Sequence, residues 1–264
     1  MKIGIFDSGL GGLIIAKSII KIMPEYDYVY LGDTKRVPYG NRSHETVFEF
    51  TRQAVDYLFK KENCALVIIA CNTASARALR QIQKEYLPKN FPERKVLGVL
   101  IPTAEESAKF NRVGILATRG TIDSETFPKE IKKLNKKINI FQNSAPMLVP
   151  LAEEGEIENA MSFIKKYLKP FLNKKLDALV LGCTHYPIFK GQIKKLLPKN
   201  IKIISQDEII PKKLKNYLEK HSEISKKLSK KHTAKILVTD LTESIKNLSK
   251  KWFGGKVKPK LVNL

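Results

Sequence analysis

The chain has 264 residues, of which 43% are hydrophobic and 28% charged, as in a globular protein with a sizeable core. We expect no secretory leader, because "MKIGIFDSG" enters an apolar strand directly, and no membrane partner, because no apolar run approaches about 18 residues. Three cysteines are too few for a disulfide framework, and their spacing fits no structural zinc site. We therefore expect a cytoplasmic protein with reduced thiols.

The formal net charge of +22 raises the question of a nucleic-acid partner. The basic residues are scattered and are densest over residues 212–232, where Leu214, Leu218 and Ile224 follow a helical spacing with lysines between them. This pattern favours solvated helix faces. A nucleic-acid-binding protein stays open as an alternative of a different class, although no aromatic RNA-binding motif or zinc-finger spacing supports it.

Short apolar runs alternate with longer amphipathic stretches, which indicates an α/β fold with mainly parallel sheets. In chain order, the predicted strands are Lys2–Phe6, Tyr28–Leu31, Ala65–Ala70, Lys95–Leu100, Arg112–Leu116, Ile138–Phe141, Ala178–Leu181, Ile201–Ile204 and Ile236–Val238. Predicted helices between them include Leu13–Ile22, His44–Lys61 and Ser75–Glu85.

The two halves of the chain repeat the same order of motifs. For example, "IGIFDSG" in the first half resembles "VGILATR" in the second. Self-similarity at a nearly constant offset indicates a duplication, so we expect two pseudo-symmetric α/β halves. The matching segments are 3–9 with 113–119, 29–33 with 138–142, and the runs that end at Cys71 and Cys183.

Both matched cysteines follow apolar runs that predict fully buried strands, "LVIIA" before Cys71 and "LVLG" before Cys183. Ligands of open parallel sheets bind beyond the carboxyl ends of the strands. If the halves face each other across a cleft, the two thiols approach one small ligand from opposite sides. A buried structural role is usual for a cysteine, and we interpret Cys64 in that way.

Two opposed thiols can invert a carbon centre by acid/base chemistry. A thiol has an unperturbed pKa of about 8.5, which neighbours or a helix N-terminus can lower. One thiolate then removes a proton from carbon while the opposite thiol delivers one, without a metal or a pyridoxal cofactor. Disulfide exchange and metal binding are alternatives, but redox pairs usually lie close in sequence and a metal site needs further ligands.

The loop "DSGLGG" at residues 7–12 lies between a strand and a helix, where backbone amides can bind a carboxylate. The loop resembles a dinucleotide fingerprint, and Asp33 stands where a ribose-binding acid would. However, Ile14 occupies the position of the third glycine, which disfavours a nucleotide. We therefore expect a small zwitterion with an anionic tail as the ligand.

Polar residues near both cysteines complete this expected site. Tyr39 and Gly40 can present a hydroxyl and an amide from a turn-rich loop, and the residues after each cysteine can donate to a carboxylate. Asp7 can take up a proton or orient the substrate ammonium. His185 can assist the neighbouring thiol, because an imidazolium favours a thiolate. The helper groups thus differ between the halves, as an asymmetric ligand requires.

Together these residues resemble the glutamate racemases of the cofactor-independent aspartate/glutamate racemase superfamily. Five motifs carry the resemblance in order: "IGIFDSGLGGL", "YLGDTKRVPYGNRS", "IIACNTAS", "PMLVPLAEEG" and "LGCTHYP". Ser75 after "CNTA", and "CTH" where aspartate racemases typically have CTE, favour glutamate. A racemase for another acidic amino acid, such as aspartate, stays as the alternative.

The resemblance implies two α/β domains with the active site in the cleft between them, which we place at residues 1–96 with 208–264 and at residues 97–207. It implies a bacterial isomerase that interconverts L- and D-glutamate without a cofactor, supplying D-glutamate for peptidoglycan in cell-wall synthesis. We also expect a homodimer. The family commonly has glutamate before the proline at Pro102, whereas this chain has Ile101, which puts an interdomain or regulatory role of that acid in doubt.

By the same resemblance, Cys71 deprotonates D-glutamate and Cys183 deprotonates L-glutamate. Glu153 is expected to assist, although Glu154 beside it competes for that role. The further assisting residues are Asp7 and His185. The implied substrate-binding residues are Asp7, Ser8, Tyr39, Gly40, Asn72, Thr73, Thr184 and His185.

Overall fold

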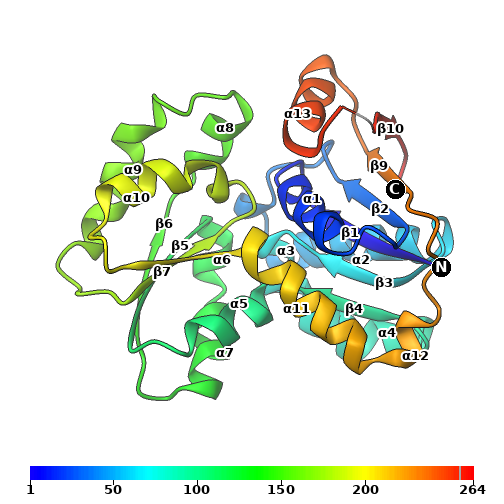
Figure 1. The fold of residues 1–264 in the computed structure, drawn as a ribbon, viewed down its shortest axis with the longest axis horizontal. Helices are drawn as coiled ribbons and strands as arrows, with labels where there is room; N and C mark the ends of the chain where they lie inside the picture. Colours follow the sequence, from blue (N-terminus) through cyan, green and yellow to red (C-terminus); the bar gives the residue numbers. More distant parts are fainter. Residues whose placement is uncertain (256) are drawn as a thin grey trace.

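The computed structural model describes residues 1–255 and 257–264, which form two parallel β-sheets flanked by helices. The strands are β1 Lys2–Asp7, β2 Tyr28–Gly32, β3 Cys64–Ile69, β4 Lys95–Gly98, β5 Arg112–Ala117, β6 Asn139–Ser144, β7 Ala178–Gly182, β8 Lys202–Ser205, β9 Ala234–Val238 and β10 Pro259–Leu261. The two sheets lie in two units side by side, and both chain termini lie in the unit that contains β1 (Figure 1).

The helices mostly follow single strands, as the sequence pattern predicts. They are α1 Gly12–Ile22, α2 His44–Lys60, α3 Asn72–Gln81, α4 Leu87–Asn90, α5 Leu100–Ser107, α6 Arg119–Asp123, α7 Thr126–Leu134, α8 Leu148–Glu153, α9 Ala160–Leu168, α10 Lys190–Leu196, α11 Gln206–Lys220, α12 Ser222–Ser225 and α13 Glu243–Phe253. Short turns of 3₁₀-helix cover Tyr39–Asn41, Lys169–Phe171 and Tyr186–Phe189, and a π-helix covers Ile82–Tyr86. No helix in the described ranges is both long enough and apolar enough to cross a membrane.

The two sheets share one strand order. The larger sheet runs β10-β9-β2-β1-β3-β4 and the smaller runs β6-β5-β7-β8, so β5 to β8 occupy the places of β1 to β4. All of these pairings are parallel, which confirms the predicted pair of similar α/β units. In each unit the chain reverses direction across the sheet at the central strand, β1 or β5. Open parallel sheets bind ligands at the carboxyl ends of the strands at such a reversal.

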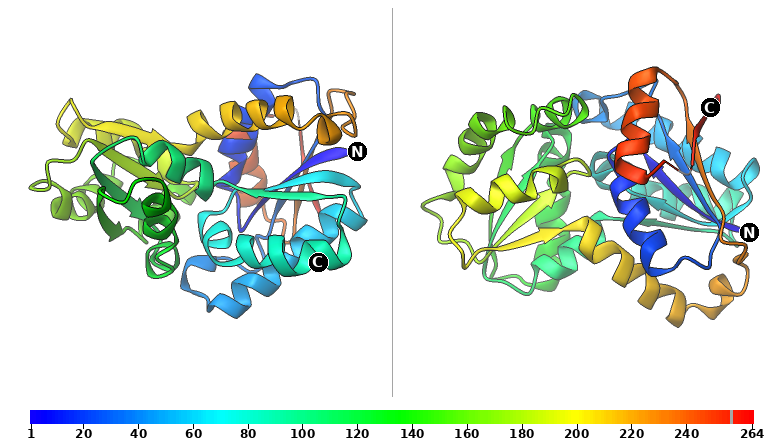
Figure 2. Two further views of the ribbon diagram at one scale, coloured as in Figure 1. Left: turned by 90° about the horizontal axis from the view of Figure 1, so that it is seen from below. Right: turned by 45° about the horizontal axis from the view of Figure 1, so that its top comes forward.

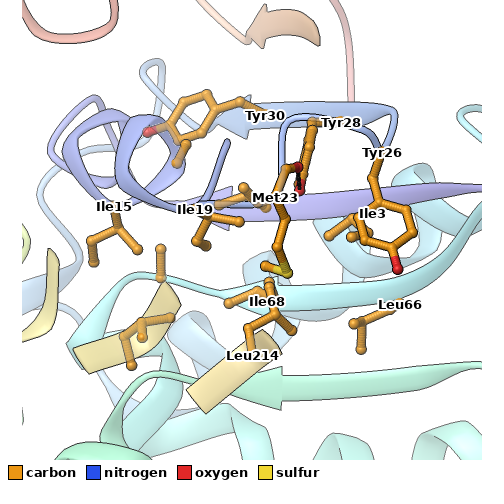
Figure 3. Packing of buried hydrophobic residues seen from close by; sticks show 14 of the residues in the cluster. Ile3, Ile15, Ile19, Met23, Tyr26, Tyr28, Tyr30, Leu66, Ile68 and Leu214 are labelled. Atoms are coloured by element: carbon orange, nitrogen blue, oxygen red, sulfur yellow. Dashed lines mark hydrogen bonds between the residues drawn. The ribbon is translucent and has the colours of Figure 1, made fainter. Parts of the chain in front are cut away.

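Apolar side chains of the larger sheet alternate between two cores, one on each face, as the two-residue period of a strand requires. Ile3 of β1 and Ile68 of β3 face α1 and α11, where they pack with Ile19 and Leu214 (Figure 3). Phe6 of β1 lies on the other face, toward α2 and α3. Burying each such side chain stabilises the fold by about 1.5–3 kcal/mol.

The helix α11 connects the two units. It begins directly after β8 of the smaller sheet and packs along the larger one (Figure 2). Ile101 of α5 packs against the core beside α2 and α3 and also against the core of the smaller sheet. Where the family resemblance implies a glutamate, this chain therefore makes an apolar contact between the units.

We propose a division of the chain into residues 1–96 with 208–264 and residues 97–207. The pairing of β4 with β3 and the packing of α11 on the larger sheet support this division. The strand β4 ends at Gly98, just past the proposed limit at residue 96.

Several elements differ from the sequence prediction, and β6 for example extends to Ser144 rather than ending at Phe141. Leu100, predicted to end a strand, begins α5, and its backbone N–H lies 3.4 Å from the hydroxyl oxygen of Ser75. The helix α3 begins at Asn72 rather than at Ser75, because the thiol of Cys71 caps it. The strand β10 was not predicted, because it has three residues and begins with a proline, which sheets accept at an edge or as the first residue of a strand.

Candidate active site

A cavity of about 380 Å³ lies between the two units, at the carboxyl ends of their strands. All the residues predicted to form the site line it except Asp7, which is buried behind the loop that follows β1. The lining residues from that set are Ser8, Tyr39, Gly40, Cys71, Asn72, Thr73, Glu153, Cys183, Thr184 and His185. The structure therefore brings both matched cysteines to one cavity.

Cys71 lies between the end of β3 and the start of α3. Its sulfur accepts a hydrogen bond from the backbone N–H of Ala74 at 3.4 Å and another from the Ser8 hydroxyl at 3.3 Å. Burial and the nearby carboxylate of Asp7 raise the pKa of the Cys71 thiol to about 12, and the two hydrogen bonds offset this only in part. Without a ligand, the group is therefore a neutral thiol at neutral pH.

Asp7 ends β1 with its side chain almost completely buried. One carboxylate oxygen accepts a hydrogen bond from the backbone N–H of Gly9 at 3.1 Å, and the other lies 3.5 Å from the Thr184 hydroxyl. Burial raises the pKa of Asp7, and the positive charge of His185 and the hydrogen bond from Gly9 counteract that rise. Asp7 thus places a buried carboxyl group between the two units.

Cys183 follows β7 and is paired with His185. Its sulfur lies 3.8 Å from Nδ1 of His185, and Nε2 of the same ring lies 3.0 Å from Oε1 of Glu153. Burial alone lowers the pKa of His185, but the hydrogen bonds and charges of Cys183 and Glu153 outweigh it and raise the pKa to about 10. Glu154, the alternative partner, is exposed and does not line the cavity.

This pairing predicts a pH dependence of stability. The folded state raises the pKa of His185 from 6.5 to about 10, so the imidazolium stabilises the fold fully below pH 6.5 and loses this effect as the pH rises through about 10. We expect the free energy of unfolding to fall over this range more steeply in the wild type than in His185→Gln, measured by chemical denaturation. In Glu153→Gln the imidazolium loses one of its partners, so the free energy of unfolding should stop falling at a lower pH than in the wild type.

His221 provides the control for this measurement, because it is half-exposed at the surface and pairs with the exposed Glu223. His221→Gln should keep the pH dependence of the wild type. If His185→Gln and the wild type showed the same pH dependence, the imidazolium would not be the buried charge that the contacts indicate.

Gly11 allows the two units to meet at the site. A Cβ at this position would lie 2.5 Å from the hydroxyl oxygen of Thr184 and 2.6 Å from Cε1 and Nδ1 of His185. Real Cβ atoms are not found this close to other atoms, so only glycine fits without moving His185 and Thr184. The loop after β1 therefore forms one wall of the pocket around His185.

Asn72 uses its side chain to bridge the units. Its Nδ2 donates to Oε1 of Gln206 at 2.8 Å, and Nε2 of Gln206 donates to Oδ1 of Asn72 at 2.7 Å. The same Nε2 lies 3.2 Å from the hydroxyl oxygen of Thr103. All three residues are buried. The Asn72 amide, predicted to contact the substrate, is thus engaged with the first residue of α11.

We expect Gln206→Leu to destabilise the protein by about 2–4 kcal/mol, because it leaves both the N–H and the C=O of the buried Asn72 amide without their Gln206 partner. Denaturant unfolding of the variant and the wild type measures this loss. Gln81→Leu is the control, since the Gln81 amide donates to Glu85 at the surface, and its effect should stay below about 0.5 kcal/mol. Equal stability of the two variants would contradict the proposed bridge.

Tyr39 lines the cavity, but its hydroxyl points to a buried acid. The hydroxyl donates to Oδ2 of Asp33 at 2.5 Å, and Asp33 also accepts from Arg36 at 2.6 Å and from Thr239 at 2.8 Å. The ring and backbone of Tyr39, rather than its hydroxyl, are therefore available to a ligand. The carboxylate of Asp33 is thus engaged by side chains of the protein. It is not available for the ribose contact that was considered from the sequence.

The hydroxyls of Thr73, Thr118 and Thr121 meet where α3 approaches α6. Thr73 lies 2.9 Å from Thr118 and 3.3 Å from Thr121, oxygen to oxygen. Thr118 also lines the cavity, although the sequence analysis did not select it. The internal repeat indicates a role for Thr118 at the site, because Thr118 in "VGILATR" aligns with Ser8 in "IGIFDSG".

Most of the other residues that line the cavity belong to the motifs that carry the family resemblance. Arg119 contributes the one lysine or arginine side chain among the described lining residues. Further lining residues are Gly9, Val37, Pro38, Asn41, Pro146, Met147, Val149 and Pro150. Within the described ranges, no group of three His, Cys, Asp or Glu side chains is placed to hold a metal ion.

Comparison with known proteins agrees with this geometry. The model of the Asp/Glu/hydantoin racemase family matches residues 14–208. A glutamate racemase from Sulfurihydrogenibium sp. (strain YO3AOP1) is 38% identical over 100% of this chain and 98% of its own length. The chain belongs to the Asp/Glu/hydantoin racemase family. A second family member, a glutamate racemase from Aquifex aeolicus, is 37% identical over 100% of this chain and 98% of its own length.

Solved structures of the racemase family share the arrangement of the two units. The crystal structure of a glutamate racemase from Francisella tularensis in complex with D-glutamate superimposes with a TM-score of 0.89 and 32% identity. The match covers 99% of this chain and 97% of that one. The racemase fold therefore extends over nearly the full chain.

Proposed function

We propose that the protein is a glutamate racemase that interconverts L- and D-glutamate through two thiols. The observation that carries this function is the placement of Cys71 and Cys183 on one cavity, each at the carboxyl end of an equivalent strand. A planar carbanion formed between two such groups can be reprotonated on either face. Family membership, with glutamate racemases as full-length relatives, supports glutamate as the substrate.

When D-glutamate is the substrate, Cys71 removes the α-proton and Cys183 delivers a proton to the opposite face. The Cys71 thiol is neutral in the free protein because burial and Asp7 disfavour its charged form. A substrate ammonium that enters beside Asp7 brings the positive charge that a thiolate needs. Proton removal is thus coupled to binding, since the empty site holds an unreactive thiol.

When L-glutamate is the substrate, Cys183 removes the α-proton. The imidazolium of His185, held by Glu153, lies beside the sulfur and stabilises negative charge there. The carboxylates of the substrate meet backbone amides at the start of α3 and the hydroxyls of Ser8, Thr73 and Thr184. These roles for the site residues are part of the proposal.

We further propose that the D-glutamate supplies peptidoglycan synthesis, that the protein is cytoplasmic, and that it forms a homodimer. The three cysteines of the chain are free thiols. Two of them must stay reduced for acid/base chemistry, which supports a reducing compartment.

Circular dichroism tests the function directly. We expect the ellipticity of D-glutamate and of L-glutamate to decay to zero when either is incubated with the purified protein without an added cofactor. D- and L-aspartate serve as matched controls and should keep their signals. Constant ellipticity with both glutamate enantiomers would overturn the proposal, and decay with aspartate alone would assign the activity to the shorter acid.

A further inference from the structure

Trp252 is the one tryptophan of the chain, and it lies against the candidate active site. The ring centroids of Trp252 and His185 are 5.6 Å apart with an angle of 83° between the ring planes. Trp252 is buried, with 7% of its surface exposed. A perpendicular arrangement at this distance is the favoured geometry of two interacting aromatic rings.

The contact joins the two units. Trp252 belongs to α13, which lies beside α1 on the larger sheet, whereas His185 follows β7 of the smaller one (Figure 1). Lys251 of α13 also lies close to the smaller unit. A Cβ added to Gly155, just after α8, would lie 3.4 Å from Nζ of Lys251. The helix therefore approaches both His185 and the segment that carries Glu153.

Several groups surround the His185 ring. Cys183 and Thr184 contact its Nδ1, Glu153 contacts its Nε2, and Gly11 leaves space beside the ring. The carboxylate of Asp7 acts on it through charge. Trp252 is the one aromatic ring with a ring–ring contact to His185 in the described part of the chain. The indole therefore packs on the imidazole in addition to these polar contacts.

We propose that Trp252 is a positioning residue that holds the His185 imidazolium against Cys183, and so serves the half-reaction that begins with L-glutamate. This inference rests on the proposed racemase function. The electron-rich indole attracts an adjacent cation in a buried site. The thiol–imidazole distance of 3.8 Å is long, so a small rotation of the ring would break the contact. Misplacement of a catalytic group by about 1 Å can slow a reaction about 100-fold.

Elimination from a glutamate with a chloride on Cβ separates the two half-reactions. A thiolate takes the α-proton, the C–H electron pair forms the double bond, and chloride leaves. The enamine then hydrolyses to the 2-oxo acid and ammonium. The L analogue reports on Cys183 and the D analogue on Cys71, and no return of a proton by the opposite thiol is needed.

We expect Trp252→Leu to slow elimination from the L analogue at least tenfold and to change elimination from the D analogue less than twofold. Trp252→Phe, which keeps an aromatic ring, should restore most of the rate with the L analogue. Phe253→Leu is the matched control, because Phe253 is the next residue on α13 and packs on the core. It should leave both eliminations within twofold of the wild type.

The fluorescence of the single tryptophan gives a readout that needs no variant of Trp252. A protonated imidazole in contact with an indole quenches its emission. Emission should therefore rise as the pH passes about 10, where His185 loses its proton. Tyrosinates form over the same range and quench tryptophan, so the measurement is the difference between the wild type and His185→Gln.

These measurements distinguish the inference from simpler explanations. Equal losses with the L and D analogues in Trp252→Leu would show a structural role and overturn the inference. So would a full rate with both analogues, or identical emission profiles for the wild type and His185→Gln. If the wild type eliminated chloride from neither analogue, the proposed racemase function itself would be wrong. A loss confined to the L analogue in Trp252→Leu supports both the racemase function and the positioning role of Trp252.

Discussion

Replacing either Cys71 or Cys183 by serine should reduce racemisation at least about 1,000-fold, because a serine hydroxyl is far too weak an acid and base at neutral pH to replace a thiol. Glutamate should still bind, since the expected carboxylate contacts come from backbone amides and from the hydroxyls of Thr73 and Thr184. Circular dichroism measures the racemisation, and calorimetric titration with D-glutamate measures the binding.

The two serine variants should differ in the half-reaction that they retain. With the chloride-bearing analogue, Cys183→Ser should eliminate from the D form through Cys71, and Cys71→Ser should eliminate from the L form through Cys183. In deuterated water, the wild type should place solvent deuterium on the α-carbon of the product enantiomer, because that proton comes from the opposite thiol.

Cys64 provides the control for both cysteines. It is fully buried, and burial raises the pKa of its thiol to about 12. It lies in the core on the α2 side of the sheet. Cys64→Ala should keep the racemisation rate of the wild type. Near-normal racemisation of both enantiomers by Cys71→Ser or Cys183→Ser would show that the replaced cysteine is structural.

Gly11→Ala should lower kcat/KM about 100-fold. The added methyl would lie 2.5 Å from the hydroxyl oxygen of Thr184 and 2.6 Å from atoms of the His185 ring, so these side chains or the loop must move. A displacement of about 1 Å at a reacting group can cost a factor of this size. Racemisation kinetics with D- and L-glutamate measure the effect.

Gly191→Ala is the matched control, because a Cβ on Gly191 of α10 meets no atom within 4 Å. It should leave kcat/KM unchanged. A Gly11→Ala variant with wild-type kinetics would mean that the loop after β1 yields without moving His185, and that this wall of the pocket is not rigid.

Much of the fold was predictable because its signals are local. The apolar runs that end at Ile69 and Gly182 are buried on both faces of their sheets, so their hydrophobicity alone marks them as strands. The internal repeat by itself places Cys71 and Cys183 at equivalent strand ends. Leu100 was predicted wrongly, because an apolar residue after a strand looks the same whether it continues the strand or begins a buried helix.

Contacts between distant segments were not predictable in the same way. Trp252 reaches His185 from a helix that the sequence analysis did not single out, and nothing about an isolated tryptophan indicates its partner. Gln206 likewise looks like an ordinary polar residue at a helix start, and only the packing of α11 across both sheets brings its amide to Asn72. The sequence indicated the chemistry of the site better than the connections that hold the site together.

The unequal surroundings of the two thiols cannot shift the equilibrium between the two enantiomers. Cys71 has Ser8 and Asp7 nearby, whereas Cys183 has His185 and Glu153. Mirror-image substrates have equal free energies in water, so the ratio of kcat/KM for the two directions must equal one whatever these neighbours do. The asymmetry can only shift how each direction divides between kcat and KM. The protein therefore cannot enrich D-glutamate by itself, and any net flow toward it must be drawn by a later reaction that consumes the D enantiomer.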